Sequence, residues 1–180
     1  MLRNSKDLER CAIGATDGTI GEVKDLYFDD EAWVIRYMVD STGAWLANRK
    51  VPVAPFERDD PHLRSCNAVL KYHIHASDGY IGRVEGLLVD DETWAIRYLI
   101  VDASNWWLGH QVLVAPQWIQ DVNWFSSNVS VDLSRKTLKD APAYATASSL
   151  DRQQEIELLE YYGRDSAHLI TRRTRQISSP

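Results

Sequence analysis

Two runs of acidic residues have the composition of a site for acid–base or metal chemistry. Asp29, Asp30 and Glu31 stand together in the phrase DDEAWVIRY, which returns at residues 90–98 as DDETWAIRY. Adjacent carboxylates can act as general acid and base, or hold Ca²⁺ or Mg²⁺. The spacing lacks the alternating ligands and trailing glutamate of an EF-hand loop. We interpret each run as a polar β-turn in which an aspartate caps the backbone and the arginine of the phrase balances the charge. A metal-dependent enzyme or metal-binding protein that uses these turns is the alternative.

The other residues suited to chemistry are scattered. His73 and His75 are two apart on an expected strand and so point to the same side, as two metal ligands would, but the sequence offers no third ligand beside them. Cys11 and Cys66 form no CxxC pair, which argues against structural zinc. The sequence therefore assigns no catalytic, cofactor-binding or metal-ligating residue.

The acidic phrase belongs to an internal duplication. Residues 1–55 align with residues 62–116 without a gap. Identical pairs include Leu2 and Leu63, Arg3 and Arg64, Asp17 and Asp78, Trp33 and Trp94, and Pro55 and Pro116. The phrase occurs twice because a structural unit was duplicated.

Each unit is predicted to be a series of short strands. In both units a DG pair between β-prone runs predicts a type I′ hairpin. Apolar residues in the next strand are three apart, so we expect a bulge or bend near Gly21 and Gly82. From Trp33 and Trp94 onward, apolar and polar residues alternate as in a strand with one buried face. The strings KVPVAP and QVLVAP supply a fourth strand.

These residues together resemble the PRC-barrel family. The strings ATDGTIGEVKDLYFDDEAWVIRYMVD and ASDGYIGRVEGLLVDDETWAIRYLIVD are similar to that family, and the similarity covers most of residues 1–145. The family is known from the cytoplasmic part of the photosynthetic reaction centre H subunit and from the C-terminal domain of a ribosome maturation factor. The resemblance implies a compact, non-catalytic β-barrel used for protein contacts. A ribosome-maturation-like factor that binds a ribosomal protein is a further alternative.

The expected fold is mainly β, with two small antiparallel β-barrel units and one or two short C-terminal helices. Repeat 1 spans residues 1–61 and repeat 2 spans residues 62–145. Residues 146–180 hold a linker, a short helix and a flexible tail. The helix is predicted to start at an Asp151 cap and to end at Gly163, with an apolar stripe that docks on a barrel or on a partner: Ile156, Leu159 and Tyr162.

Repeat 1 lacks a segment that repeat 2 has. After Pro116, alternating Val129, Val131 and Leu133 predict a closing strand, whereas only FERDDP stands between Pro55 and the second repeat. We expect repeat 1 either to pack against repeat 2 across a pseudo-two-fold axis or to borrow a strand from another chain. A homodimer with strand exchange is therefore expected. The fourth strand of repeat 1 contains a proline, which suits an edge strand.

Several tryptophans are candidates for partner binding. Trp33 and Trp94 are expected to pack in the core, and Trp124 to seal a barrel or the contact between the copies. The residues in or beside turns are the predicted partner-binding residues: Trp45, Trp106 and Trp107.

Charge and composition limit the function classes. The net charge of −6 and the pI near 5.3 disfavour direct binding of nucleic acid. Neither a transmembrane segment nor a signal peptide is expected, and the low cysteine content fits a reducing compartment, so we expect a cytoplasmic location. The sequence predicts a non-catalytic protein-interaction or assembly module without a cofactor, with an unidentified protein partner.

Overall fold

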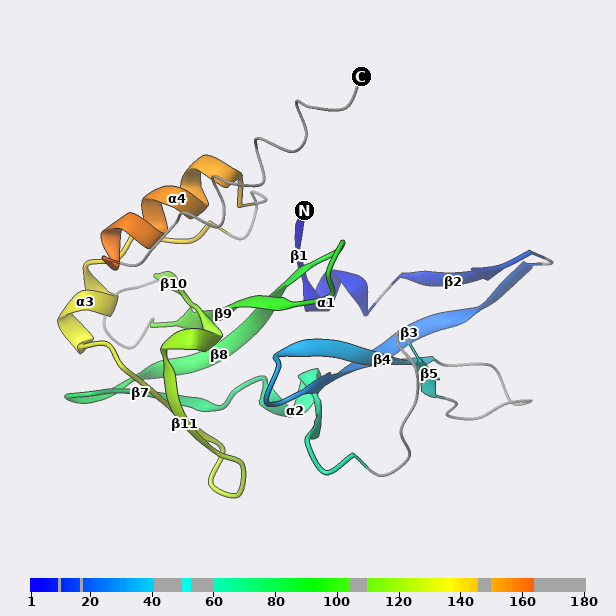
Figure 1. The fold of residues 1–180 in the computed structure, drawn as a ribbon, viewed down its shortest axis with the longest axis horizontal. Coiled ribbons are helices and arrows are strands. Elements are labelled where there is room, and N and C mark those ends of the chain that lie inside the picture. The colour runs from blue at the N-terminus through cyan, green and yellow to red at the C-terminus, as the bar shows by residue number, and fades with distance from the viewer. Residues whose placement is uncertain are drawn as a thin grey trace.

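A computed structural model describes residues 1–9, 11–16, 18–40, 50–52, 60–103, 110–145 and 150–163. Most of its elements are strands, arranged in two sheets (Figure 1). The prediction of a mainly β protein is therefore confirmed, but the helices at residues 5–8 and 66–69 were not predicted. Within the described part of the chain, no helix is long and apolar enough to cross a membrane.

The first sheet is built largely from repeat 1. Its strands follow the order β2-β3-β4-β5, and β6 pairs with the end of β3. The bounds are β2 Ala12–Ala15, β3 Gly18–Asp29, β4 Val34–Asp40, β5 Lys50–Pro52 and β6 Leu63–Ser65. β5 lies at the edge of this sheet, as its proline predicts, because proline cannot donate to a ladder.

The second sheet is built largely from repeat 2. Its strands follow the order β10-β9-β8-β7-β12-β11, and β1 pairs with the end of β8. The bounds are β1 Leu2–Asn4, β7 His73–Ala76, β8 Gly79–Asp90, β9 Ile96–Asp102, β10 Gln111–Val114, β11 Ile119–Asn123 and β12 Asn128–Val131. The closing strand is confirmed as β12, but it lies parallel to β7. Among the described strands, β10 and β11 do not pair, so closure into a barrel is not confirmed.

The long hairpins are bent where glycines were expected to bend them. Opposite β7, one extra residue of β8 stands between Tyr80 and Gly82, and opposite β2 one extra residue of β3 stands between Thr19 and Gly21. A Cβ on Gly82 would lie 1.9 Å from the backbone oxygen of Asp102, so no side chain fits there. The predicted type I′ turn is wrong for repeat 2. Its two loop residues, 77 and 78, lack the positive φ that this turn requires at both positions.

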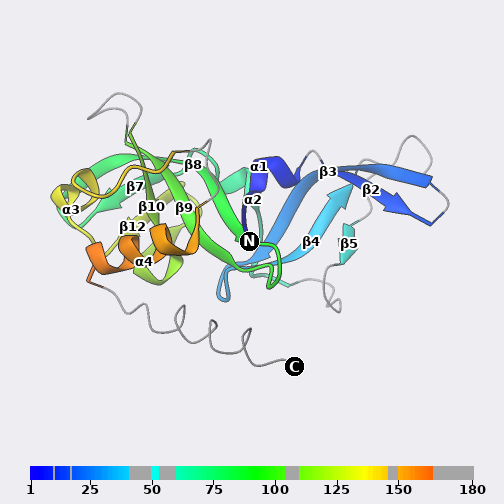
Figure 2. The same cartoon turned by 90° about the horizontal axis from the view of Figure 1, so that it is seen from above.

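The first strand of each repeat pairs with the sheet of the other repeat. β1 lies antiparallel to the end of β8, with Leu2 opposite Asp90. β6 lies antiparallel to the end of β3, with Leu63 opposite Asp29. The two registers are the same once the offset of the duplication is applied, so the repeats exchange their first strands. Figure 2 shows the N-terminus at the centre of the molecule, between the two halves. Repeat 1 thus contacts repeat 2 within one chain, the first of its two expected arrangements.

The duplicated phrase forms the joint between the repeats. The amide of Ile35 donates to the carbonyl of Trp94 at 2.8 Å, and the amide of Ile96 donates to the carbonyl of Trp33 at 2.7 Å. The two tryptophans have φ angles of 53° and 60°, a region that bulky residues rarely adopt. Because this conformation recurs at the same place in both repeats, it belongs to the architecture of the joint.

The described residues also form four helices and one 3₁₀ turn, each of ten residues or fewer. Their bounds are α1 Ser5–Leu8, α2 Cys66–Val69, the 3₁₀ turn η1 Pro116–Trp118, α3 Arg135–Lys139 and α4 Arg152–Tyr161. Asp151 and Gln154 form the expected capping box of α4, and Gly163 follows it with a φ of 62°. The buried stripe of α4 differs from the predicted one. Leu159 and Tyr162 are buried as predicted, but Leu158 and Glu155 are buried beside them, and Ile156 is only half-buried.

Candidate functional site

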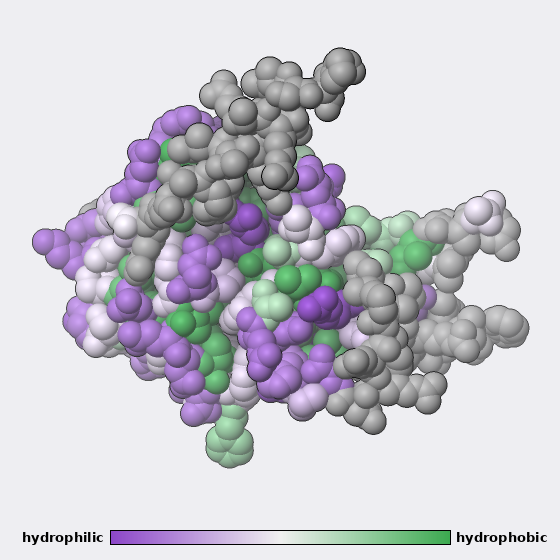
Figure 3. All heavy atoms as spheres, in the orientation of Figure 1, coloured by the Kyte–Doolittle hydropathy of each residue, from purple (hydrophilic) through white to green (hydrophobic). Residues whose placement is uncertain are grey.

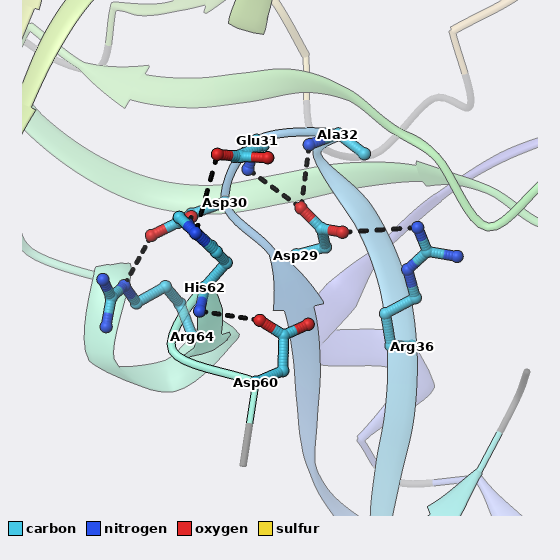
Figure 4. Close-up of polar contacts among 8 residues, drawn as sticks. All are labelled: Asp29, Asp30, Glu31, Ala32, Arg36, Asp60, His62 and Arg64. Atoms are coloured by element: carbon cyan, nitrogen blue, oxygen red, sulfur yellow. Dashed lines mark hydrogen bonds and ion pairs between the residues drawn. The ribbon is translucent and has the colours of Figure 1, made fainter. Parts of the chain in front are cut away.

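Asp29 organises the first acidic turn (Figure 4). Its Oδ1 atom accepts hydrogen bonds from the amides of Glu31 and Ala32, both at 2.9 Å. Its Oδ2 atom accepts a bond from Arg36 at 3.3 Å. Partial burial opposes ionisation of Asp29, but these donors outweigh it and hold its pKa below the ordinary value. The interpretation of a capping aspartate balanced by arginine is confirmed for this turn.

Asp30 clamps the exchanged strand β6. Its Oδ2 atom accepts a hydrogen bond from Arg64 Nε at 2.7 Å, and its Oδ1 atom lies 2.9 Å from His62 Nδ1. The amide of His62 also donates to Asp60, as Figure 4 shows. The side chain of Asp30 is only 7% exposed. Its negative charge therefore needs these hydrogen bonds to offset the loss of hydration. The hydrogen bond with Asp30 raises the pKa of His62.

The second acidic turn clamps strand β1 in the same way. Asp91 Oδ1 lies 2.7 Å from the amino group of Met1, and Asp91 Oδ2 accepts a bond from Arg3 Nε at 2.8 Å. These two hydrogen bonds lower the pKa of Asp91. Asp90 caps the turn by accepting from the amide of Glu92 at 3.0 Å. Each acidic run therefore holds the strand that the other repeat donates.

A buried carboxylate ties α4 to repeat 2. Glu155, 8% exposed, accepts a hydrogen bond from the hydroxyl of Tyr98 at 2.8 Å and another from Arg97 at 3.0 Å. Burial, followed by the charge of Glu155, raises the pKa of Tyr98. Sequence reasoning missed Glu155 because its partners lie in a strand far away in the chain.

An open cleft of about 870 Å³ lies where the first acidic turn faces repeat 2. Residues 30–33, His62 and Arg64 form one side of it. Residues 95–97 and a set of residues between Pro116 and Trp124 form the other side. On the face of the molecule in Figure 3, hydrophobic residues are scattered among hydrophilic ones, and the cleft likewise mixes polar, charged and aromatic side chains.

Aromatic residues mark the end of β11 at this cleft. The guanidinium carbon of Arg64 lies 4.6 Å from the ring centre of Trp124, which also packs near Phe28 and Tyr72 at 6.5 and 6.1 Å. Phe125, in the turn after β11, is fully exposed, with a relative exposure of 101%. Sequence reasoning overlooked Phe125. The available signal was an aromatic residue in a turn between two predicted strands, where burial is hard to achieve.

The structure places only some of the other predicted residues. The predicted partner-binding residues lie outside the described part of the chain: Trp45, Trp106 and Trp107. His73 and His75 do face the same side, since both rings lie against Tyr80, with centroids 5.6 and 5.7 Å away. Trp33 is half-buried and stacks on Phe28 at 5.1 Å, in agreement with its expected role in the core.

No protein-family model matches this chain, and no curated protein matches it significantly. The site is therefore interpreted from its own geometry. Among the residues that the structure describes, no three His, Cys, Asp or Glu side chains form a cluster suited to a metal ion. The acidic turns position strands through hydrogen bonds, and the neighbouring cleft offers an open surface with half-buried aromatic rings and exposed amide groups.

Proposed function

We propose that this chain is a non-catalytic binding module of the PRC-barrel type, which holds a protein partner in the cleft between its repeats. The observation that carries this proposal is the fully exposed Phe125 in the turn beside that cleft. A large aromatic side chain beside a cleft can supply much of the binding energy of a protein interface once a partner buries it.

The bonding of the carboxylates supports a binding role over a catalytic one. Asp29 accepts two backbone amides, and Asp30 accepts the donors of the exchanged strand. Carboxylates that work as general bases need a raised pKa and access to a substrate proton. The pKa of Asp29 is lowered instead, as expected of a structural cap.

The cleft has the composition of a protein-docking surface. Trp33 and Trp124 supply apolar area, and the exposed side chains of Gln117 and Gln120 supply amide donors. Interfaces of this kind combine an aromatic centre with a polar rim. A protein surface that offers an apolar side chain together with hydrogen-bond acceptors for Gln117 and Gln120 would meet both requirements.

We also propose a homodimer in the cytoplasm. The exchange of β1 and β6 within one chain is a contact that two chains could make with each other in the same register. The two cysteines are free thiols, which fits a reducing compartment. Light scattering across a range of protein concentrations tests the dimer, and a monomer at all concentrations would rule it out.

Site-specific photo-cross-linking tests the proposed cleft. A benzophenone amino acid replaces Phe125 in the full chain expressed in its own host, and a matched control places it at the exposed Gln153 on α4. We expect one discrete cross-linked protein from position 125 and none above background from position 153. A second variant, Gln120→Trp, fills the cleft without changing a buried residue and should remove the cross-link. Equal cross-linking at both positions, or no effect of Gln120→Trp, would contradict the proposal.

A further inference from the structure

The outer edge of β2 differs from the outer edge of its counterpart in repeat 2. β7 is covered by β12, which runs parallel to it with Val129 opposite Ile74. The amide of His73 donates to the carbonyl of Ser127 at 2.9 Å, and the amide of Ser77 donates to the carbonyl of Leu133 at 2.9 Å. In repeat 1 the described residues include no strand on the corresponding side of β2, which pairs only with β3.

The backbone of β2 is already oriented to accept such a strand. The carbonyl of Cys11 accepts a hydrogen bond from Val23 on β3 at 3.1 Å. In a planar trans peptide the next amide points the opposite way, so the amide of Ala12 points away from β3. Tyr72 and His73 have the same arrangement in repeat 2, where the outward amide of His73 donates to the carbonyl of Ser127, the residue just before β12.

Equivalent isoleucine side chains in the two repeats differ in burial, as expected if repeat 1 lacks a covering strand. Ile74 is 0% exposed, whereas its counterpart Ile13 is only half-buried. β12 and the short segment that follows it contribute side chains that are 0%, 1% and 8% exposed: Val129, Val131 and Leu133. Repeat 1 has no sequence counterpart of this segment, because its alignment with repeat 2 ends at Pro55.

We propose that repeat 1 binds an extended strand of another protein, parallel to β2, with β-branched or leucine residues at alternate positions. The main-chain donors of β2 would supply affinity, and the space over Ile13 would select the alternating apolar side chains. Repeat 2 defines the chemistry of the occupant, since β12 is that strand on the equivalent edge. This edge of β2 is distinct from the cleft, so the two proposals can be tested separately.

Cys11 makes the proposal testable by disulfide trapping on the full chain. Asn128 lies opposite His73, so the register extended by one residue places Ser127 opposite Tyr72, the counterpart of Cys11. Neighbouring strands lie about 4.8 Å apart, within the span of a disulfide. The probe is the nonapeptide of residues 126–134, SSNVSVDLS, with cysteine in place of Ser127 and its sulfur activated as a 2-pyridyl disulfide. The Cys11 thiolate attacks the peptide sulfur, the bond to the pyridyl sulfur breaks, and pyridine-2-thione leaves, so the exchange needs no oxidant. Cys11 is exposed and Cys66 is buried, so only the former should react.

We expect the probe to form a mixed disulfide with Cys11 faster than two control peptides that carry the same 2-pyridyl disulfide. One control has a scrambled sequence, and the other has proline in place of Val129, which removes a ladder amide. In the chain, Ala12→Pro removes the outward amide alone and should slow trapping about fivefold, the effect of one hydrogen bond. Circular dichroism confirms that this variant folds.

Three results would overturn the proposal. The first is equal trapping rates for the probe and both control peptides. The second is an unchanged rate in a folded Ala12→Pro variant, since the amide it removes is the one that should bond the added strand. The third is a disulfide-linked dimer through Cys11 that forms without peptide and excludes the probe, because a second copy of the chain would then occupy this edge.

Discussion

The clamp on the exchanged strand β6 predicts a specific loss of stability. In the variant Arg64→Met the aliphatic stem is retained, while the hydrogen bond to Asp30 at 2.7 Å and the contact with Trp124 at 4.6 Å are lost. A hydrogen bond to a charged group contributes about 1.5 kcal/mol or more. The cation–π contact adds about 0.5 kcal/mol. We expect the free energy of unfolding to fall by about 2 kcal/mol and Tm to fall by about 4–8 °C.

The duplication supplies a matched control. Arg3→Met removes the equivalent bond from the clamp on β1, but Arg3 is 52% exposed against 33% for Arg64, and the amino group of Met1 remains beside Asp91. Arg3→Met should therefore lower the free energy of unfolding clearly less than Arg64→Met does. Urea denaturation followed by tryptophan fluorescence measures both variants, and a double-mutant cycle with Asp30→Asn isolates the pair.

Two results would refute this reasoning. If Arg64→Met changed the stability by less than about 0.5 kcal/mol, it would behave as an ordinary surface substitution, and β6 would not be clamped by Asp30. If Arg3→Met and Arg64→Met cost the same, burial would not set the strength of the two clamps.

Three further predictions concern other parts of the molecule. In an NMR titration, His62 should show a pKa above 6.5, and this pKa should return toward 6.5 in the Asp30→Asn variant. The contact between His62 and Asp30 therefore stabilises the fold fully below pH 6.5, and this stabilisation is lost as the pH rises through the raised pKa. If His62 had the same pKa in the unmodified protein and in Asp30→Asn, that result would contradict the contact between His62 and Asp30. Tyr98 should not ionise near pH 10 in the folded protein, so Tyr98→Phe should leave the tyrosinate absorbance step there unchanged; a smaller step would contradict its burial. Gly82→Ala should cost about 2–3 kcal/mol because its Cβ meets a backbone oxygen of β9, whereas Gly86→Ala meets only side-chain atoms and should cost less in the same denaturation assay.

Local features of the fold were predictable because they depend on near neighbours in the sequence. The bulge beside Gly82 follows from the spacing of apolar residues within one strand. The cap at Asp151 and the edge position of Pro52 follow from what each side chain or missing amide can do by itself. The turn type after Ala76 was not predictable from the DG pair, because the strongly bent strand that follows also constrains the loop.

Long-range features were not predictable, for a physical reason. Strands of three residues such as β1 and β6 have no periodicity to read, and their partners are chosen by contacts between the repeats. Glu155 is polar and looks like a surface residue until Tyr98 and Arg97 are placed against it. The cleft exists only because β11, which repeat 1 lacks, stands opposite the turn of repeat 1.

Residues that the two repeats share and segments in which they differ have different roles. Because each clamp joins an aspartate of one repeat to an arginine of the other, each copy has to carry both members of the pair, and the exchange of strands then makes neither sheet complete without the other repeat. The shared sequence therefore encodes the scaffold. The cleft beside β11, and the edge of β2 on which no described strand lies, arise where repeat 2 has a segment that repeat 1 lacks. Substitutions at shared positions should act mainly on stability, and substitutions at Gln120, Phe125 or Ala12 mainly on binding.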